Sequence, residues 1–357
     1  GRTIDINESG FYNVRFTGRG SWTVTDTTLS ANNIVLTAGT LTLPAGTTTI
    51  SGAFNNNGGA FNNNGSIMVF DGTTAGNLVR GDGSDFAGMQ FTGSGSWTMS
   101  DTNATATDSV LISAGTLTLP SGVFAVGGDF DNQSGTVTHN TSEIKLTSNS
   151  GAVLYANGSD LGGVDFAGTG PFTMTDESIT LTENLTVSAG SVTFASGTLA
   201  IGGSFDASGG IFDSATGTIL FNSSDTGETI DAGASPFYNV VFGSASGGWT
   251  ITADATTTNN FTLTAAADFT LQSGATLYVA NVFDNSVGGG ATTWSGSTLV
   301  LNGGAAYAIN TKSDSGDQYD TLQITADTDI SMWHSAATTT VVAASASAAV
   351  VEAAATA

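Results

Sequence analysis

The chain repeats itself at a long, nearly constant period. One phrase returns three times with modest changes and a fifth copy is looser, with copies starting at Phe11, Phe86, Leu161, Phe237 and Tyr319. The first two copies read FYNVRFTGRGSWTVTD and FAGMQFTGSGSWTMSD. Successive starts are about 75 residues apart, and only the last step is clearly longer. Self-similarity of this kind is typical of stacked structural units, each contacting its neighbours. The period therefore limits the fold to a solenoid or to a row of small domains.

The repeat sets the expected boundaries. They are 1–10 (the end of a preceding repeat), 11–85, 86–160, 161–236, 237–318, and 319–357 (a partial fifth repeat with an Ala-rich tail). The segment GRTIDINESG at 1–10 matches GETIDAGASP at 227–236. We therefore expect either a longer parent chain or subunits that associate end to end. The tail at 341–357 could be a flattened coil, a spacer or a helix.

Short alternating segments fill each repeat. SWTVT, NIVLT, TLTLP and SIMVF alternate apolar and polar residues and are rich in Val, Ile and Thr, which predicts strands. Gly, Asn, Asp and Ser between them predict tight turns. We predict an all-β fold, a parallel β-helix (β-solenoid) of four and a half repeats of about 75 residues forming one continuous solenoid. Coils of about 18–25 residues would give three or four coils per repeat. Ile34, Leu36, Leu41 and Leu43 would point inward; a tandem array of small β-sandwiches is the alternative.

Charge and composition exclude several classes of protein. The chain has six Lys and Arg against 30 Asp and Glu, a formal net charge of −24, so we expect no nucleic-acid partner. No apolar run is long enough to span a bilayer, so we expect no membrane insertion. Cysteine is absent, so no disulfide framework holds the fold.

The Gly- and Asn-rich composition of the repeats is similar to that of a known group of proteins. Phrases such as AGTLTLPSG and FNNNGGAFNNNG resemble the Gly/Asn-rich parallel β-helix repeats of bacterial surface adhesins, both autotransporter passengers and filamentous-haemagglutinin-like exoproteins. The resemblance implies secretion, display at the cell surface, and adhesion or scaffolding.

One acidic or amide position recurs in the repeats. Its members are Asn55, Asp131, Asp206 and Asp284. Asn and Asp side chains hydrogen-bond nearby backbone, so a ladder of turns is one interpretation. Carboxylates are also hard oxygen ligands, so a calcium ladder is the alternative, and it is the one cofactor that the sequence suggests. Asp26, Asp101 and Asp176 form a second such set, with the same two interpretations.

A large side chain also recurs, at Trp22, Trp97, Phe172 and Trp249. An apolar residue lies two positions after each one, which places both on the same face of a strand. We predict a structural aromatic column in the core. An outward column would instead be a platform for carbohydrate.

Catalysis is not expected. An active site would make one coil differ from the others, whereas the acidic residues occupy equivalent positions in successive repeats. The two histidines, His139 and His334, occupy non-equivalent positions and are interpreted as surface residues. Arg80-Gly81-Asp82 could be read by integrins, but the next repeat has Tyr155-Ala156-Asn157 there, which favours a solvated turn.

These features predict an extracellular or cell-surface structural protein, either a filament subunit or the stalk of an adhesin. Parallel coils leave open strand edges, which would allow head-to-tail stacking by strand addition. One alternative is an adhesin module that binds a glycan or a surface receptor. A second is a polysaccharide-degrading β-helix enzyme or tailspike.

Overall fold

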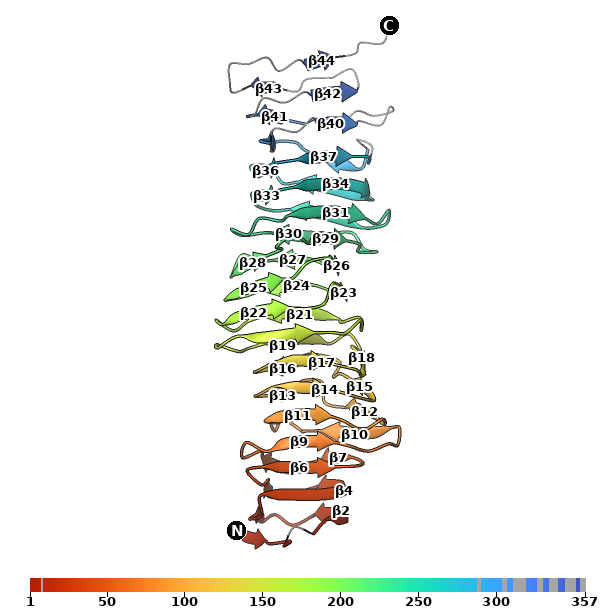
Figure 1. Ribbon diagram of the computed structural model, residues 1–357, viewed down its shortest axis with the longest axis vertical. Coiled ribbons are helices and arrows are strands. Elements are labelled where there is room, and N and C mark those ends of the chain that lie inside the picture. The colour runs from red at the N-terminus through yellow and green to blue at the C-terminus, as the bar shows by residue number, and fades with distance from the viewer. Residues whose placement is uncertain are drawn as a thin grey trace. The chain divides into compact units, whose positions relative to one another are not determined.

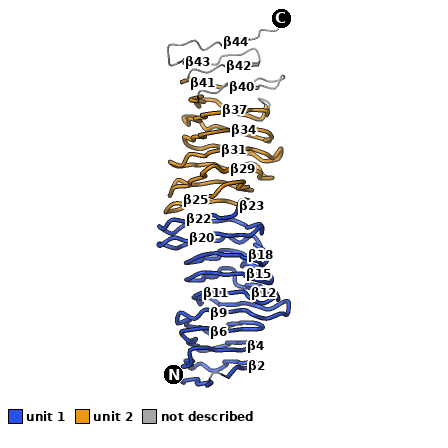
Figure 2. The backbone as a smooth tube through the Cα atoms, viewed as in Figure 1, with its two compact units in different colours: residues 1–176 blue, residues 177–357 orange. Residues whose placement is uncertain are grey.

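The structure is a computed structural model that describes residues 1–7, 9–287, 290–303, 307–310, 319–325, 330–333, 340–343 and 351–353. The chain is an all-β solenoid of about 15 turns, as predicted, and its described residues contain no helix. It divides into two compact units, residues 1–176 and 177–357 (Figure 2). No described helix has the length and apolar character needed to cross a membrane.

Unit 1 consists of parallel strands stacked on one another (Figure 1). Its first stack contains β1 (Arg2–Ile4), β3 (Ser21–Val24), β5 (Thr40–Thr42) and β8 (Ala60–Asn62). The second contains β2 (Phe11–Phe16), β4 (Thr28–Leu36), β7 (Phe54–Asn56), β10 (Asn77–Arg80), β12 (Ser96–Met99), β15 (Thr116–Thr118) and β18 (Thr136–Thr138). The third, which also joins β4, contains β6 (Thr47–Ile50), β9 (Ile67–Phe70), β11 (Gly88–Phe91), β14 (Val110–Ile112), β17 (Phe130–Asn132), β20 (Ala152–Tyr155) and β22 (Pro171–Met174). The fourth contains β13 (Ala104–Ala106), β16 (Val123–Val126), β19 (Glu143–Leu146) and β21 (Gly163–Phe166).

Unit 2 is built in the same way. One stack contains β24 (Leu185–Val187), β27 (Phe205–Asp206), β30 (Glu228–Asp231), β32 (Gly248–Ile251), β35 (Asp268–Leu271) and β38 (Thr292–Thr293). Another contains β23 (Ser178–Leu181), β26 (Thr198–Ile201), β29 (Thr218–Phe221), β31 (Asn239–Gly243), β34 (Asn260–Ala265) and β37 (Val282–Asn285). The rest are β25 (Ser191–Phe194) with β28 (Ile211–Asp213); β33 (Ala255–Thr257), β36 (Thr276–Val279), β39 (Thr298–Leu301), β41 (Thr321–Ile324) and β43 (Thr340–Ala343); and β40 (Tyr307–Asn310), β42 (Ile330–Trp333) and β44 (Val351–Ala353). The described parts of the Ala-rich tail are thus strands.

The coil is shorter than the sequence repeat and does not divide it evenly. Most register partners in unit 1 lie about 20 residues apart, a common length for one solenoid turn, and Trp97 and Leu117 are an example. One coil in each of the first two repeats is longer, because Asn55 pairs with Arg80 and Asp131 pairs with Tyr155. A repeat of about 75 residues therefore covers three coils and part of a fourth. Equivalent strands of successive repeats consequently fall in different stacks.

This mismatch corrects the predicted aromatic column. Trp22, Trp97 and Phe172 lie on β3, β12 and β22, which belong to the first, second and third stacks of unit 1. Trp22 stacks between Arg2 and Leu41 rather than on another member of the set. A column along one face is therefore wrong for these three residues, although the side chains do recur in the chain.

What recurs is an aromatic pair within the coil. Each of the four residues packs against a phenylalanine six or seven positions earlier, and the ring centroids lie 5.2, 5.6, 5.2 and 5.2 Å apart in the pairs Phe16–Trp22, Phe91–Trp97, Phe166–Phe172 and Phe242–Trp249. Trp97, Phe172 and Trp249 are at most 1% exposed and lie in the core. Offset or edge-to-face aromatic pairs contribute about 0.5–1.5 kcal/mol beyond the area they bury.

Local sequence explains the corners of the coil and its core. In the AGT phrases, Gly39 and Gly115 have φ of +76° and +71°, and a Cβ there would collide with the carbonyl oxygen of the coil below. Only glycine fits such a corner without strain. Ile34, Leu36, Leu41 and Leu43 are fully buried as predicted, because alternate residues of a strand face the same side.

Candidate functional site

The recurring Asx positions lie on the outside of strands. Asn55 is in β7, and its register partners on the two adjacent strands are Val35 and Arg80. Arg15 on β2 pairs in turn with Val35. These four outward residues, Arg15, Val35, Asn55 and Arg80, form a file across β2, β4, β7 and β10, and we call it the outer file of repeat 1.

The same file recurs with different chemistry. In repeat 2 its members are Gln90, Leu111, Asp131 and Tyr155, which are register partners across β11, β14, β17 and β20. In unit 2 the file includes Thr186, Asp206 and Asp231, and in repeat 4 it includes Val241, Thr262 and Asp284. The strand pairing that builds the file is the same in these repeats, but the charge of its residues changes from positive in repeat 1 to negative in repeat 3.

The four Asx residues do not form a ladder of turns, so that interpretation is wrong. All four lie within strands. They do not pair with one another, because the repeat is longer than the coil. Of the four, only Asp206 makes the expected local backbone contact within the described structure, accepting a hydrogen bond from Ser208 N at 2.9 Å. Among the described residues no three His, Asp or Glu side chains converge on one point. Calcium binding stays a prediction, and of the four recurring Asx residues Asp206 has a second aspartate, Asp231, as its register partner.

The residue that follows three of the four Asx residues is a buried asparagine, whose structural role sequence reasoning missed. Asn56, Asn132 and Asn285 follow Asn55, Asp131 and Asp284, and all three are fully buried. Asn132 donates to Ala156 O at 2.8 Å and accepts from Gly135 N at 3.0 Å, and Asn56 makes the equivalent bonds to Gly81 O and Gly59 N. Strand alternation contained the signal, since adjacent residues face opposite sides.

The second set of aspartates holds loops together. Asp101 accepts hydrogen bonds from Gly81 N at 2.6 Å and Asp82 N at 3.1 Å, and Asp176 accepts from Ala156 N at 2.8 Å and Asn157 N at 2.7 Å. Asp26 likewise accepts from Ile6 N at 2.8 Å. Each carboxylate thus holds a loop of the preceding coil. A carboxylate that accepts two backbone N–H groups satisfies donors that would otherwise be unpaired.

The Arg80-Gly81-Asp82 tripeptide is internally engaged. Arg80 Nη2 lies 2.9 Å from Asp82 Oδ1, and Arg80 Nε lies 3.7 Å from Asp101 Oδ1. Arg80 Nη1 also donates to Asn57 Oδ1 at 3.1 Å. A receptor that reads the Arg and Asp charges separately would have to break this pair.

The histidines show no convergence on a site within the described part of the chain. His139 is partly buried, and its Nδ1 accepts a hydrogen bond from Thr141 N at 3.2 Å, as a turn residue does. His334 lies outside the described residues.

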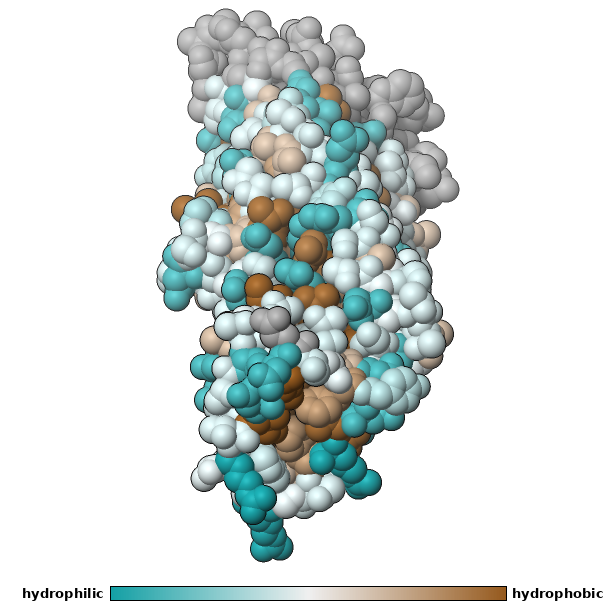
Figure 3. All heavy atoms as spheres, turned by 60° about the horizontal axis from the view of Figure 1, so that its bottom comes forward, coloured by the Kyte–Doolittle hydropathy of each residue, from teal (hydrophilic) through white to brown (hydrophobic). Residues whose placement is uncertain are grey.

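A hollow lies over the outer file of repeat 1. Its volume is about 380 Å³, and the lining residues are Asn13, Val14, Arg15, Asn33, Val35, Ala53, Asn55 and Leu78. We call it the repeat-1 hollow. A smaller hollow of about 220 Å³ lies over the Asp131 and Tyr155 end of the repeat-2 file and is lined by Asp129, Asp131, Val153, Tyr155 and Thr175. Figure 3 shows apolar surface interspersed with hydrophilic side chains.

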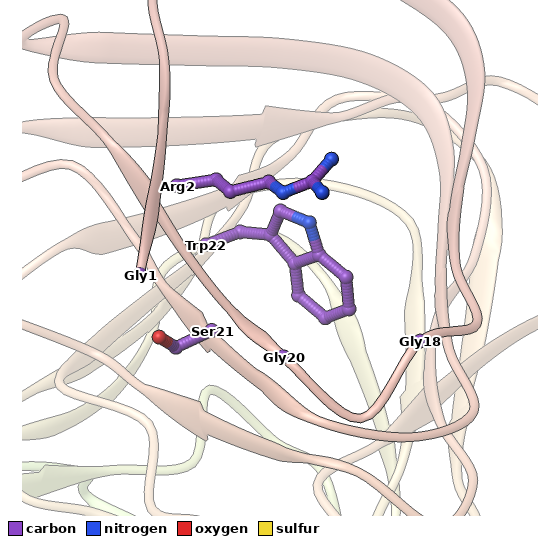
Figure 4. A pocket seen from close by; sticks show the side chains of 6 residues that line it. All are labelled: Gly1, Arg2, Gly18, Gly20, Ser21 and Trp22. Carbon is purple, nitrogen blue, oxygen red and sulfur yellow. The ribbon is translucent and has the colours of Figure 1, made fainter.

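A further pocket, of about 430 Å³, lies in the first coil (Figure 4). Its lining includes Arg2, Ser21 and Trp22, and the Arg2 side chain extends beside the Trp22 ring. Arg2 and Trp22 are register partners on β1 and β3.

Comparison with protein-family models, with curated proteins and with solved structures gave no match. The interpretation of the chain therefore depends on its own residues and geometry.

Proposed function

We propose that this chain is a structural segment of an extracellular or cell-surface protein, such as a filament subunit or the stalk of an adhesin. The observation that carries the proposal is how the recurring residues are used. The aromatic pairs, the corner glycines and the loop-holding aspartates all stabilise contacts within or between coils. Repetition of this kind is expected where selection acts on the stack rather than on one unique cleft.

Charge and surface composition agree with an exposed scaffold. The net charge of −24 favours solubility and opposes side-by-side association of equal chains. Outward positions are rich in Thr, which suits an extended backbone in contact with water. The resemblance of the repeats to bacterial surface adhesins supports the same conclusion.

The test is where the protein lies in the cell that makes it. Intact cells are treated with a protease that cannot enter them, and the chain is followed with an antibody beside a cytosolic protein. Loss of the chain while the cytosolic protein survives is the expected result. A chain that is cleaved only after the cells are broken open would refute surface display.

Mechanical behaviour gives a second, independent test. A chain held between handles in a force instrument should lengthen in several steps as groups of coils detach, because each coil contacts only its neighbours. One single step for the whole chain would contradict the scaffold proposal.

A further inference from the structure

The repeat-1 hollow combines three kinds of surface: a cation with no ion-pair partner among the described residues, side-chain amide groups and an apolar floor. We propose that it binds a saccharide that carries a carboxylate, the class to which uronic acids belong. This proposal goes beyond a structural role, and either could fail without the other.

The cation is Arg15. Its side chain is exposed and, among the described residues, has no ion-pair partner. Arg80, at the other end of the file, is by contrast paired with Asp82 and Asp101. A free guanidinium offers a planar fork that matches a carboxylate. Arg15 therefore supplies the group that would select an acidic ligand.

The amide groups are Asn55 and Asn13. Asn55 Oδ1 is buried and, within the described part of the chain, has no hydrogen-bond partner. Buried acceptors without a donor are uncommon, and a rotation of the Asn55 amide toward the hollow would bring Oδ1 to a ligand hydroxyl that satisfies it. Asn33 is held in place by two hydrogen bonds, since its Nδ2 donates to Asn13 Oδ1 and its Oδ1 accepts from Ala53 N, both at 2.7 Å. This contact leaves the Asn13 Nδ2 group oriented by Asn33 and able to donate.

The apolar floor comes from Val35 and Leu78, which are partly buried outward residues of β4 and β10. Arg15, Val35 and Asn55 are register partners on three consecutive strands. Two strand spacings, roughly 9–10 Å, therefore separate the Cα atoms of Arg15 and Asn55. A sugar acid has hydroxyl groups, a carboxylate and a C–H face, and it can use all three surfaces at once. The hollow's volume of about 380 Å³ is within the range of small-ligand sites.

An acidic peptide fits less well. A peptide usually docks on a sheet by adding a strand to a free edge. The floor here is interior to its stack, because β4 pairs with both β2 and β7, and β7 pairs with both β4 and β10. Only side chains are available here, so a peptide backbone finds no strand edge to pair with, whereas sugar hydroxyl groups can both donate to and accept from side-chain amides.

The outer file of repeat 2 is an internal control. It has Gln90 where repeat 1 has Arg15, and Asp131 where repeat 1 has Asn55. It therefore lacks the cation and adds a negative charge, so it should not bind an anionic sugar. The same comparison supplies substitutions that the coil already accommodates.

The experiment uses calorimetric titration of the full chain with trigalacturonate, its methyl-esterified form and polyglutamate. The variants are Arg15→Gln and Asn55→Asp, both copied from repeat 2. The control is Arg19→Ser, which removes an equal charge from an exposed residue outside the hollow and copies Ser94 of repeat 2. Circular dichroism confirms that every variant is folded.

We expect trigalacturonate to bind and the ester to bind more weakly. Arg15→Gln should weaken binding by about 10- to 100-fold, the range for a lost charge-assisted hydrogen bond. Asn55→Asp should also weaken binding, because it places a negative charge beside the ligand carboxylate, and Arg19→Ser should leave binding unchanged. Absence of binding at millimolar ligand would overturn the proposal. Equal weakening by Arg15→Gln and Arg19→Ser, equal binding of the ester, or equally tight polyglutamate binding that depends on Arg15 would also overturn it.

Discussion

Replacing Asp176 by Ala tests how the coils are held together. The side chain is 6% exposed and accepts hydrogen bonds from Ala156 N at 2.8 Å and Asn157 N at 2.7 Å. A hydrogen bond to a charged group contributes about 1.5–3 kcal/mol. Water can replace the carboxylate at exposed Asn157, but Ala156 is buried, so its N–H would be left without a partner. We expect a local loss of about 2–4 kcal/mol.

Hydrogen exchange measured by mass spectrometry reports the loss of local stability at the affected residues. In a repeat protein a local defect opens nearby coils without unfolding the whole chain. The peptide that contains Ala156 and Asn157 should exchange about 30- to 1,000-fold faster in Asp176→Ala. Asp176→Asn, which keeps one acceptor, should show a smaller rise.

Asp160→Ala is the matched control. Asp160 is exposed, and among the described residues it forms no ion pair and no side-chain hydrogen bond. The change removes the same charge from the same loop region and should leave exchange near the wild-type rate. Equal protection in Asp176→Ala and Asp160→Ala would refute the inference that these aspartates hold the loops.

Three further predictions concern the core, an ion pair and the repeat itself. Trp97→Ala should cost about 3–5 kcal/mol in urea unfolding, whereas Trp97→Phe, which copies Phe172, should cost clearly less; equal losses would contradict the aromatic-pair argument. Lys145 Nζ lies 2.6 Å from Asp165 Oδ2, and this hydrogen bond, aided by the charges of Asp165 and Glu143, raises the pKa of Lys145 above its ordinary 10.5. The resulting stability is complete below pH 10.5 and is lost as pH rises through the folded-state pKa, so the melting-temperature advantage over Lys145→Met should shrink in strong alkali; an advantage that is independent of pH would refute this. Deleting residues 86–160 should leave a cooperatively folded chain by circular dichroism, because the flanking repeats supply equivalent neighbours, whereas deleting residues 86–95, about half a coil, should not.

The candidate site was only partly accessible to sequence reasoning. Spacing identified Asn55 and Asp131 as equivalent positions, and strand alternation could have separated them from buried Asn56 and Asn132. Their partners could not be found in this way. Arg15, Val35 and Asn55 are brought together by register, and register depends on how many residues each coil takes.

The sequence by itself determined the all-β solenoid, the repeat and the inward residues. These follow from period-two alternation and from corner glycines, which act over a few neighbouring residues. Only the tertiary structure decided which repeated residues share a face. The repeat is not a whole number of coils, so equivalent residues of successive copies lie in different stacks. Trp22 and Trp97, in the first and second stacks, are an example. Stacked strands pair residues that lie one coil apart in the sequence. Neighbours in space therefore come from different positions of the repeat, and no single copy of the repeat shows which side chains lie together.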